Sequence, residues 1–180
     1  MAKSNKTKYA LLGLLNLRPA SGYDLKKTVD RSIGFFWNEN YGHIYPILKR
    51  METEGLIKKR VEESDEHPVK NVYALTANGK KEFLKWLGGT VEELPLRNEM
   101  LLKLFFGTHM NREDIITMLN SQKEKNENLM KVYGKIKEKI STKKSHDALY
   151  WNLTLNFGMQ RSKMIISWCN ETLKALGRKN

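Results

Sequence analysis

The hydrophobic positions in the first half of the chain predict three helices that are separated by breaks. Residues 3–17 carry apolar side chains around nearly the whole circumference of a helix, which ends before Pro19. Residues 22–33 follow Ser21, a favourable N-cap residue. Residues 40–55 end at a glycine and carry one narrow apolar stripe at helical spacing. That stripe consists of Ile44, Ile47, Leu48 and Met51. We expect it to pack on the first two helices, which leaves the opposite side of the third helix exposed.

Two strand patterns and a fourth helix pattern follow. Residues 56–61 and 69–75 read as strands, and the polar segment 62–68 between them is too long for a tight two-residue hairpin. Thr76 is a favourable N-cap residue for a helix over residues 77–87. Three helices, a β-hairpin and a further helix are the order of a winged helix-turn-helix domain.

Beyond a glycine-containing linker, the pattern predicts only helices. The first covers residues 96–106, and the last runs from about 145 to 176. Between them, a helix capped by Asn111 carries an unbroken heptad register, in which the spacing alternates between four and three residues. Such a register is typical of a coiled-coil interface, and polar residues within it tend to fix the register and the partner number. The heptad positions are Ile115, Leu119, Gln122, Asn126, Leu129, Tyr133, Ile136 and Ile140.

These patterns predict a mainly α-helical protein with a small β-hairpin. We expect a winged-helix DNA-binding domain over residues 1–87, a linker over 88–95, and a helical dimerisation domain over 96–180. A helix that is apolar all round must be buried on more than one side, so the first helix predicts contact with a partner chain as well as with its own core. We therefore expect a homodimer held by the heptad positions and by four residues of the first helix. Those four are Tyr9, Leu11, Leu12 and Leu15.

The net charge of the chain indicates which class of molecule it binds. The chain of 180 residues is 40% hydrophobic and 29% charged, as expected for a folded globular protein. Its formal net charge of +12 favours nucleic acid or another polyanion. Basic and acidic residues divide equally between residues 1–90 and 91–180, so charge alone does not say which half binds it. The longest apolar run, Tyr9 to Leu15, is too short to span a membrane, and no signal-peptide pattern is present. We expect a cytoplasmic protein without membrane association.

The sequence contains no pattern of an enzyme, a cofactor site or a metal site. It lacks a phosphate-binding glycine loop, a nucleophile elbow and a zinc-protease histidine pair. The four histidines are scattered, and Cys169 is the only cysteine, so an intrachain disulfide is impossible. The acidic residues between 62 and 66 lack the alternation and the glycine of a calcium loop.

The outer side of the third helix is the candidate DNA-reading surface. Tyr45 can donate to a phosphate, and Lys49 and Arg50 can contact phosphates or guanine edges. Gly42 and Pro46 are compact and allow close approach to a groove. On residue types alone, an ordinary solvated helix face is an equal alternative. The expected contacts from this helix and its N-terminus are Asn40, Tyr41, Gly42, His43, Tyr45, Pro46, Lys49 and Arg50.

The segment between the two predicted strands has the wrong charge for a DNA-binding wing. Phosphates would repel its acidic residues Glu62, Glu63, Asp65 and Glu66. The flanking strands are basic, so we expect them to contact the DNA backbone while the acidic tip stays away from it. The basic flank residues are Lys58, Lys59, Arg60 and Lys70.

Several motifs in the right order resemble the PadR family of bacterial regulators. They are Tyr-Ala-Leu-Leu-Gly-Leu-Leu at 9–15, Ser-Gly-Tyr-Asp-Leu at 21–25, the segment from Gly42 to Ile57, and Tyr-Ala-Leu-Thr-Ala-Asn-Gly at 73–79. The helical remainder resembles, mostly in layout, the virulence-activator-type C-terminal region of the larger PadR subfamily. The resemblance implies a winged-helix domain and a dimer held by the first and the C-terminal helices. It also implies repression, less often activation, at an inverted-repeat operator.

The same resemblance implies a response to phenolic acids or other small aromatic effectors in some members. Aromatic residues of the last helix, together with Trp37, are candidates for such a site, since aromatic walls suit a flat ligand. An aromatic-rich core is the alternative interpretation. The candidate effector residues are Trp37, Tyr150, Trp151, Phe157 and Trp168. A coiled-coil adaptor whose winged helix does not bind DNA is the alternative function. The sequence identifies neither the operator, nor the effector, nor the sign of regulation.

Overall fold

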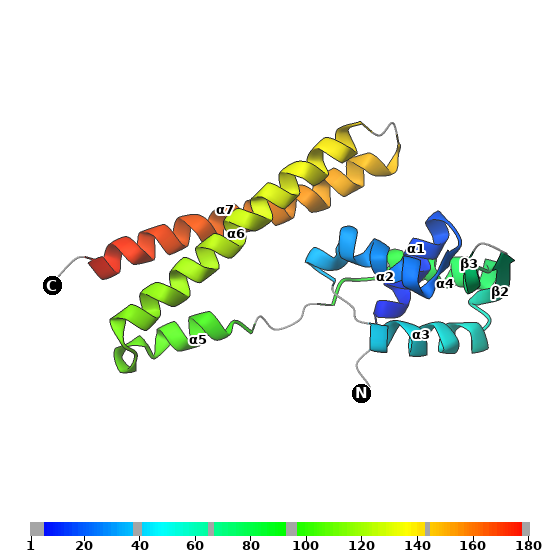
Figure 1. Cartoon of the computed structure of the whole chain (residues 1–180), viewed down its shortest axis with the longest axis horizontal. Coiled ribbons are helices and arrows are strands. Elements are labelled where there is room, and N and C mark those ends of the chain that lie inside the picture. Colours follow the sequence, from blue (N-terminus) through cyan, green and yellow to red (C-terminus); the bar gives the residue numbers. More distant parts are fainter. Residues whose placement is uncertain (1–5, 38–40, 65–66, 93–96, 143–144, 178–180) are drawn as a thin grey trace. The chain divides into compact units, whose positions relative to one another are not determined.

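The computed structural model describes residues 6–37, 41–64, 67–92, 97–142 and 145–177 (Figure 1). It is mostly helical and contains one small antiparallel sheet, as predicted. The chain folds as two compact units, Met1–Glu93 and Leu94–Asn180, each with its own buried core.

The N-terminal unit contains four helices and a three-stranded sheet among its described residues. Its helices are α1 (Thr7–Leu17), α2 (Gly22–Arg31), α3 (Tyr41–Thr53) and α4 (Ala77–Leu87), with a short 3-10 turn at Ile33–Phe35. Its strands are β1 (Ala20–Ser21), β2 (Ile57–Ser64) and β3 (His67–Leu75). The strand order is β1-β3-β2, all antiparallel, and the short strand β1 is the element that sequence reasoning missed. This is the winged helix-turn-helix arrangement.

Helix α1 packs mainly within its own unit, while its expected contact with a partner chain stays a prediction. Leu11 and Leu12 are 0% exposed and Leu15 is 3% exposed, because α1 contacts α2, α3, α4 and β3. Tyr9 stacks on Trp86 of α4, with ring centroids 4.7 Å apart. The core of a single chain thus accounts for the buried leucines of this helix, while Leu17 is 55% exposed.

The hairpin is longer than the sequence predicted, and the expected loop over residues 62–68 is wrong. The ladder continues past Val61, where Glu62 pairs with Lys70, and ends where Ser64 pairs with His67, with a register irregularity between Glu62 and Ser64. Opposite charges directly across two strands favour pairing, so the polar composition that suggested a loop supports strands here. Asp65 and Glu66 lie outside the described residues.

The C-terminal unit consists of α5 (Glu99–Phe105), a 3-10 turn at Gly107–His109, α6 (Arg112–Ser141) and α7 (Asp147–Gly177). Helices α6 and α7 run side by side as a long helical hairpin (Figure 1). Asn98 caps α5, since its side chain accepts a hydrogen bond from the backbone N–H of Leu101.

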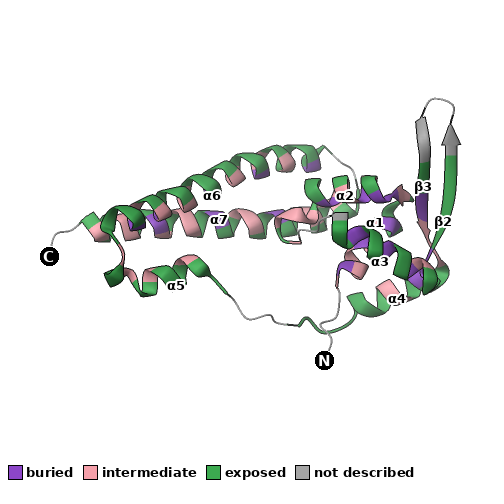
Figure 2. Cartoon of the chain, turned by 60° about the horizontal axis from the view of Figure 1, so that its bottom comes forward, coloured by how far each residue is buried: buried purple, intermediate pink, exposed green. Residues whose placement is uncertain are grey.

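The heptad seam of α6 is occupied by the chain's own last helix. Ile115, Leu119, Asn126, Tyr133 and Ile140 are buried within the single chain, while Gln122, Leu129 and Ile136 are partly buried. On α7 the buried positions Leu155, Ser162 and Cys169 recur every seven residues (Figure 2). The periodicity is that of a helix–helix seam, and α7 of the same chain packs against it, while a seam between two chains stays a prediction.

Candidate nucleic-acid interface

Helix α3 divides into a buried stripe and an exposed outer side. Ile44, Leu48 and Met51 are 0% exposed and Ile47 is 5% exposed, and all four belong to the core shared with α1 and α2. The expected packing of this stripe is therefore confirmed. Six predicted contact residues lie on the opposite, exposed side: Gly42, His43, Tyr45, Pro46, Lys49 and Arg50.

Pro46 does not interrupt α3, although a proline inside a helix removes one backbone hydrogen bond. The helix begins at Tyr41, so the carbonyl that loses its partner is that of Gly42 in the first turn. Gly42 and Pro46 are both exposed, and water can satisfy that carbonyl. Asn40 and the side chain of Tyr41, both predicted contacts, lie outside the described residues.

The cations of α3 face solvent. The Arg50 Nε atom lies 3.6 Å from a carboxylate oxygen of Glu54, one turn further along the helix, and both side chains are more than two-fifths exposed. Exposed pairs of this kind contribute little free energy, so Arg50 can exchange Glu54 for a phosphate at small cost. Lys49 is exposed beside it, four residues after Tyr45 and therefore on the same side of the helix.

The hairpin carries the predicted basic flank, and all four residues are exposed: Lys58, Lys59, Arg60 and Lys70. Alternation along β2 places Lys58, Arg60 and Glu62 on one side of the strand. Arg60 forms an ion pair with Glu62 at 2.6 Å, and Glu62 lies directly opposite Lys70 on β3. Glu62 thus lies among the cations of the hairpin.

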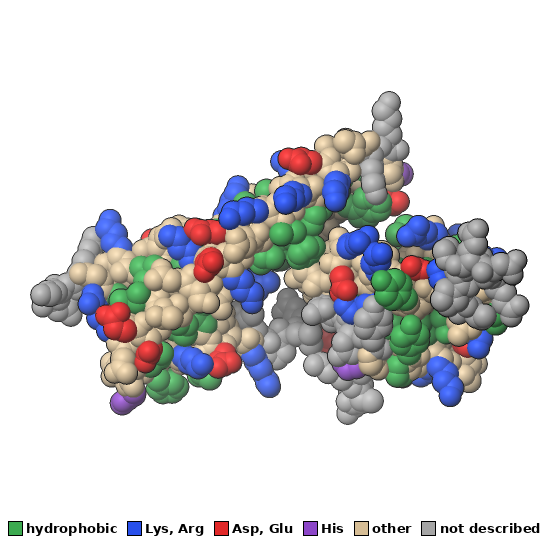
Figure 3. Space-filling model, viewed as in Figure 1, with side chains coloured by type: hydrophobic (Ala, Val, Ile, Leu, Met, Phe, Trp, Pro, Cys, Tyr) green, Lys and Arg blue, Asp and Glu red, His purple; other side chains and the backbone are tan. Residues whose placement is uncertain are grey.

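Lys and Arg side chains are distributed over the visible surface of both units (Figure 3). This agrees with the equal division of charge along the sequence. The positions on α3 and the hairpin, rather than a charge excess, single out the N-terminal unit as the nucleic-acid interface.

The four candidate effector residues of α7 differ in burial and are spread along the helix. Tyr150 and Phe157 are 59% and 72% exposed, whereas Trp151 and Trp168 are partly buried. Tyr150 and Trp168 are separated by about 27 Å along the helix, from a rise of ~1.5 Å per residue. Trp168 packs on the core of Ile115, Leu119 and Cys169. For Trp168 the structure therefore favours the alternative interpretation, an aromatic residue that packs on a core.

Trp37, in the N-terminal unit, has a distinct environment. Its indole Nε1 atom is buried and has no hydrogen-bond partner among the described residues. Buried donors are normally paired, so this N–H is a candidate to donate to an acceptor from outside the chain.

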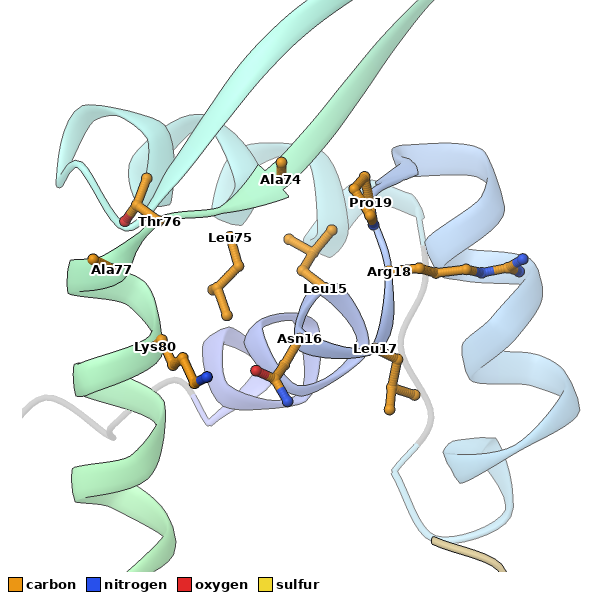
Figure 4. A pocket seen from close by; sticks show the side chains of 10 residues that line it. All are labelled: Leu15, Asn16, Leu17, Arg18, Pro19, Ala74, Leu75, Thr76, Ala77 and Lys80. Atoms are coloured by element: carbon orange, nitrogen blue, oxygen red, sulfur yellow. The ribbon is translucent and has the colours of Figure 1, made fainter. Parts of the chain in front are cut away.

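A recess of about 360 Å³ lies where the end of α1, the end of β3 and the start of α4 meet (Figure 4). Its lining is mainly aliphatic, and Thr76 in its wall is used structurally, because its hydroxyl oxygen accepts from the N–H of Gly79 and caps α4. No candidate effector residue lines this recess.

Among the residues that the structure describes, neither a metal site nor a membrane-spanning helix is found. No three histidine, cysteine, aspartate or glutamate side chains there are grouped so that they could hold a metal ion. No helix there combines the length and apolar character needed to cross a membrane.

An apolar stripe on α7, which helical spacing in the sequence already indicates, is exposed in the structure. Its members lie opposite the face that packs on α6, and each is more than half exposed. Helix α5 adds an exposed pair, Phe105 and Phe106. Three of its members, Tyr150, Phe157 and Met164, are seven residues apart. The stripe residues are Leu149, Tyr150, Leu153, Phe157 and Met164.

Two family models match the chain, one for each half. The model described as "Transcriptional regulator PadR-like family" matches residues 11–85, and "Virulence activator alpha C-term" matches residues 96–177. Among curated proteins, the negative transcriptional regulator PadR of Bacillus subtilis is 28% identical over 95% of this chain and 97% of its own length.

Solved structures show the same similarity. Bacillus subtilis PadR in complex with operator DNA matches with a TM-score of 0.84 and 29% identity, over 94% of this chain and 98% of that one. Bacillus subtilis PadR in complex with p-coumaric acid matches with a TM-score of 0.76 and 27% identity, over 99% of this chain and 100% of that one. The similarity thus extends through both units.

Proposed function

Because this chain belongs to the PadR family of transcriptional regulators, we propose that it is a sequence-specific repressor that acts as a homodimer at an inverted-repeat operator. The observation that carries the proposal is the exposed side of α3, where Tyr45, Lys49 and Arg50 project from a helix whose opposite side is fully buried. The similarity to a relative crystallised with operator DNA supports it. Members of this family are transcriptional regulators, not enzymes, and we place the protein in the cytoplasm, where bacterial operators lie.

In the proposed complex, α3 enters the major groove and the hairpin lies along the backbone. Tyr45 and Lys49 approach base edges or phosphates, and the cations of the hairpin neutralise phosphates. A twofold dimer places its two copies of α3 on half-sites about one helical turn apart.

Removal of two outer side chains of α3 tests this function. Tyr45→Ala and Lys49→Ala should each weaken operator binding while leaving the fold intact, since neither residue belongs to the core. A base-reading contact should cost about 1–3 kcal/mol at one operator position. Fluorescence anisotropy at matched salt gives the affinity, and Lys81→Ala, on the exposed side of α4, is the matched control. If both α3 variants stay folded and bind as tightly as the parent, α3 is not the reading element.

The homodimer needs a different interface from the one that the heptad pattern predicted, because that seam is filled within the chain. We place it at the apolar stripe of α7, together with the exposed phenylalanines of α5. Contiguous exposed apolar surface of this kind marks an interaction site.

A small aromatic effector completes the proposal. The support is a relative crystallised with p-coumaric acid and the unpaired, buried indole N–H of Trp37. Phenolic acids should release the protein from its operator, and Trp37→Phe should reduce that response without reducing operator affinity. No release and no thermal shift across a panel of phenolic acids would leave Trp37 and the aromatic residues of α7 as packing residues.

The alternative is a protein-interaction adaptor whose winged helix does not bind DNA. The exposed apolar stripe would then bind a different protein. A mobility shift with random duplex DNA at low salt separates the two, because a DNA-binding protein shows salt-dependent non-specific binding.

A further inference from the structure

A glycine at the start of α2 lies against the phenol of Tyr45. A Cβ atom added to Gly22 would lie 2.7 Å from Cε1, 3.0 Å from Cζ and 3.2 Å from the hydroxyl oxygen of Tyr45. Carbon atoms in proteins pack at about 3.5–4.0 Å, so no other side chain fits there while the ring stays in place. The far end of the ring, including the hydroxyl, is therefore the part that approaches α2.

The backbone at Gly22 is held from two directions. Ser21 precedes it as the N-cap of α2, with its hydroxyl oxygen accepting from the N–H of Asp24 at 3.1 Å. Ser21 also pairs with Val72 in the sheet. Because both the cap and the sheet fix this turn, a clash at position 22 would be relieved by movement of Tyr45 rather than of α2.

Tyr45 can move in that way. Its side chain is 48% exposed, and the atoms that meet position 22 are at the end of a flexible side chain rather than in the backbone. Glycine is also less favourable than alanine within a helix. Gly22 does not have a positive φ that would require glycine, so the close approach of the ring is the reason that the structure offers for it.

We infer that Gly22 is a positioning residue for DNA recognition: by lacking a Cβ, it lets the Tyr45 phenol lie across the start of α2, in the orientation that contacts the operator. The inference rests on the proposed function, since it assumes that Tyr45 meets DNA. Gly22 itself is not proposed to contact DNA.

A double-mutant cycle tests this role. We expect Gly22→Ala and Tyr45→Ala each to weaken operator binding by about fivefold per half-site, the factor that corresponds to one net hydrogen bond. The double variant should bind no more weakly than Tyr45→Ala alone, because the added methyl group then has no ring to displace. The melting temperature of Gly22→Ala should equal or exceed that of the parent.

Gly13→Ala is the matched control. Its added Cβ would lie 3.2 Å from the ring of Phe83, inside the same domain but away from α3. We expect this variant to lose thermal stability and to keep the operator affinity of the parent while folded. If Gly22 had only a structural role, Gly22→Ala would likewise lose thermal stability and keep the operator affinity of the parent.

These binding measurements distinguish the proposed reading surface of α3 from the positioning role of Gly22. If Tyr45→Ala binds like the parent, Tyr45 does not contact DNA and the positioning role is wrong, and if Lys49→Ala also binds like the parent, the proposed reading surface is wrong too. If Tyr45→Ala weakens binding but Gly22→Ala does not, the positioning role is wrong. It is also wrong if Gly22→Ala weakens binding further in the Tyr45→Ala background, or if it destabilises the fold as Gly13→Ala does.

Discussion

At the scale of single residues, helical periodicity predicted which side chains are buried, but it did not predict which polar side chains contact one another. The four stripe residues of α3 could be predicted because their spacing matches one side of a helix, and all are at most 5% exposed. The Lys8–Glu82 and Tyr9–Glu82 contacts could not be predicted from the sequence, since the two residues of each pair are 74 and 73 residues apart in the chain. No local pattern signals such a pairing, because it depends on how α1 packs on α4.

The contacts of Glu82 predict a pH-dependent contribution to stability. The Lys8 ammonium and the Tyr9 hydroxyl both donate to its carboxylate, at 3.0 and 3.1 Å, and these hydrogen bonds lower the pKa of Glu82 below its ordinary value. A lowered folded-state pKa stabilises the protein above the ordinary pKa, and this gain is lost as pH falls through the lowered value. Glu82→Gln should therefore reduce the free energy of unfolding at pH 7 by at most about 1 kcal/mol, since the pair is partly exposed.

Urea unfolding at pH 7 and near pH 3 checks this prediction. The difference between Glu82→Gln and the parent should shrink at the lower pH, because the stability contributed by the lowered pKa of Glu82 is lost progressively as pH falls through that lowered value. A difference that is the same at both values would mean that the lost packing of the side chain, not its charge, causes the effect.

At the scale of elements, the helices were predictable and the hairpin was only partly so. Helix α4 has the bounds that its N-cap and glycine stop predict, Ala77–Leu87. The strands extend further than expected, because hydrogen bonding and cross-strand charge pairs continue beyond the apolar residues that define a strand in the sequence. Helix α7 has two apolar faces, and the packed one contains the smaller residues. There, a Cβ on Gly158 would lie only 3.1 Å from the ring of Tyr133, so a small residue is needed for close approach to α6.

The charge pattern of the hairpin predicts that its acidic residues weaken DNA binding. Glu62 pairs with Arg60 at 2.6 Å and faces Lys70, so it neutralises cations that would otherwise meet phosphates. Glu62→Gln should strengthen binding to operator and random duplex alike. It should also steepen the dependence of log affinity on log salt by about one unit per half-site, as expected for one more phosphate neutralised.

Titrations at several salt concentrations measure that slope. Glu113→Gln, at the exposed start of α6, removes the same charge from a helix without a proposed DNA contact and is the matched control. An unchanged slope and affinity for Glu62→Gln would show that the hairpin stays away from the DNA backbone.

At the scale of the whole molecule, the sequence predicted a partner chain, and the position of its interface stays a prediction. Both predicted surfaces, α1 and the seam of α6, are used within one chain. An apolar pattern shows that a surface is buried and does not show whether its partner belongs to the same chain. The surface that remains is the stripe of α7, where Phe157 is 72% exposed. Isolated exposed apolar residues are common, but five on one side of one helix indicate an interface.

A charge placed in the stripe should separate the two chains of the proposed dimer. In a single chain the side chain at position 157 faces water, so Phe157→Glu should leave the far-UV circular dichroism unchanged. Within a dimer interface the carboxylate would lose its hydration without gaining a partner, which is strongly unfavourable. Sedimentation at micromolar concentration should therefore show a dimer for the parent and a monomer for the variant, and operator affinity should fall because one half-site no longer assists the other. Asn128→Glu adds the same charge at an exposed position of α6, outside the stripe, and should remain dimeric. A monomeric parent, or a dimer that survives Phe157→Glu, would mean that α7 does not hold two chains together.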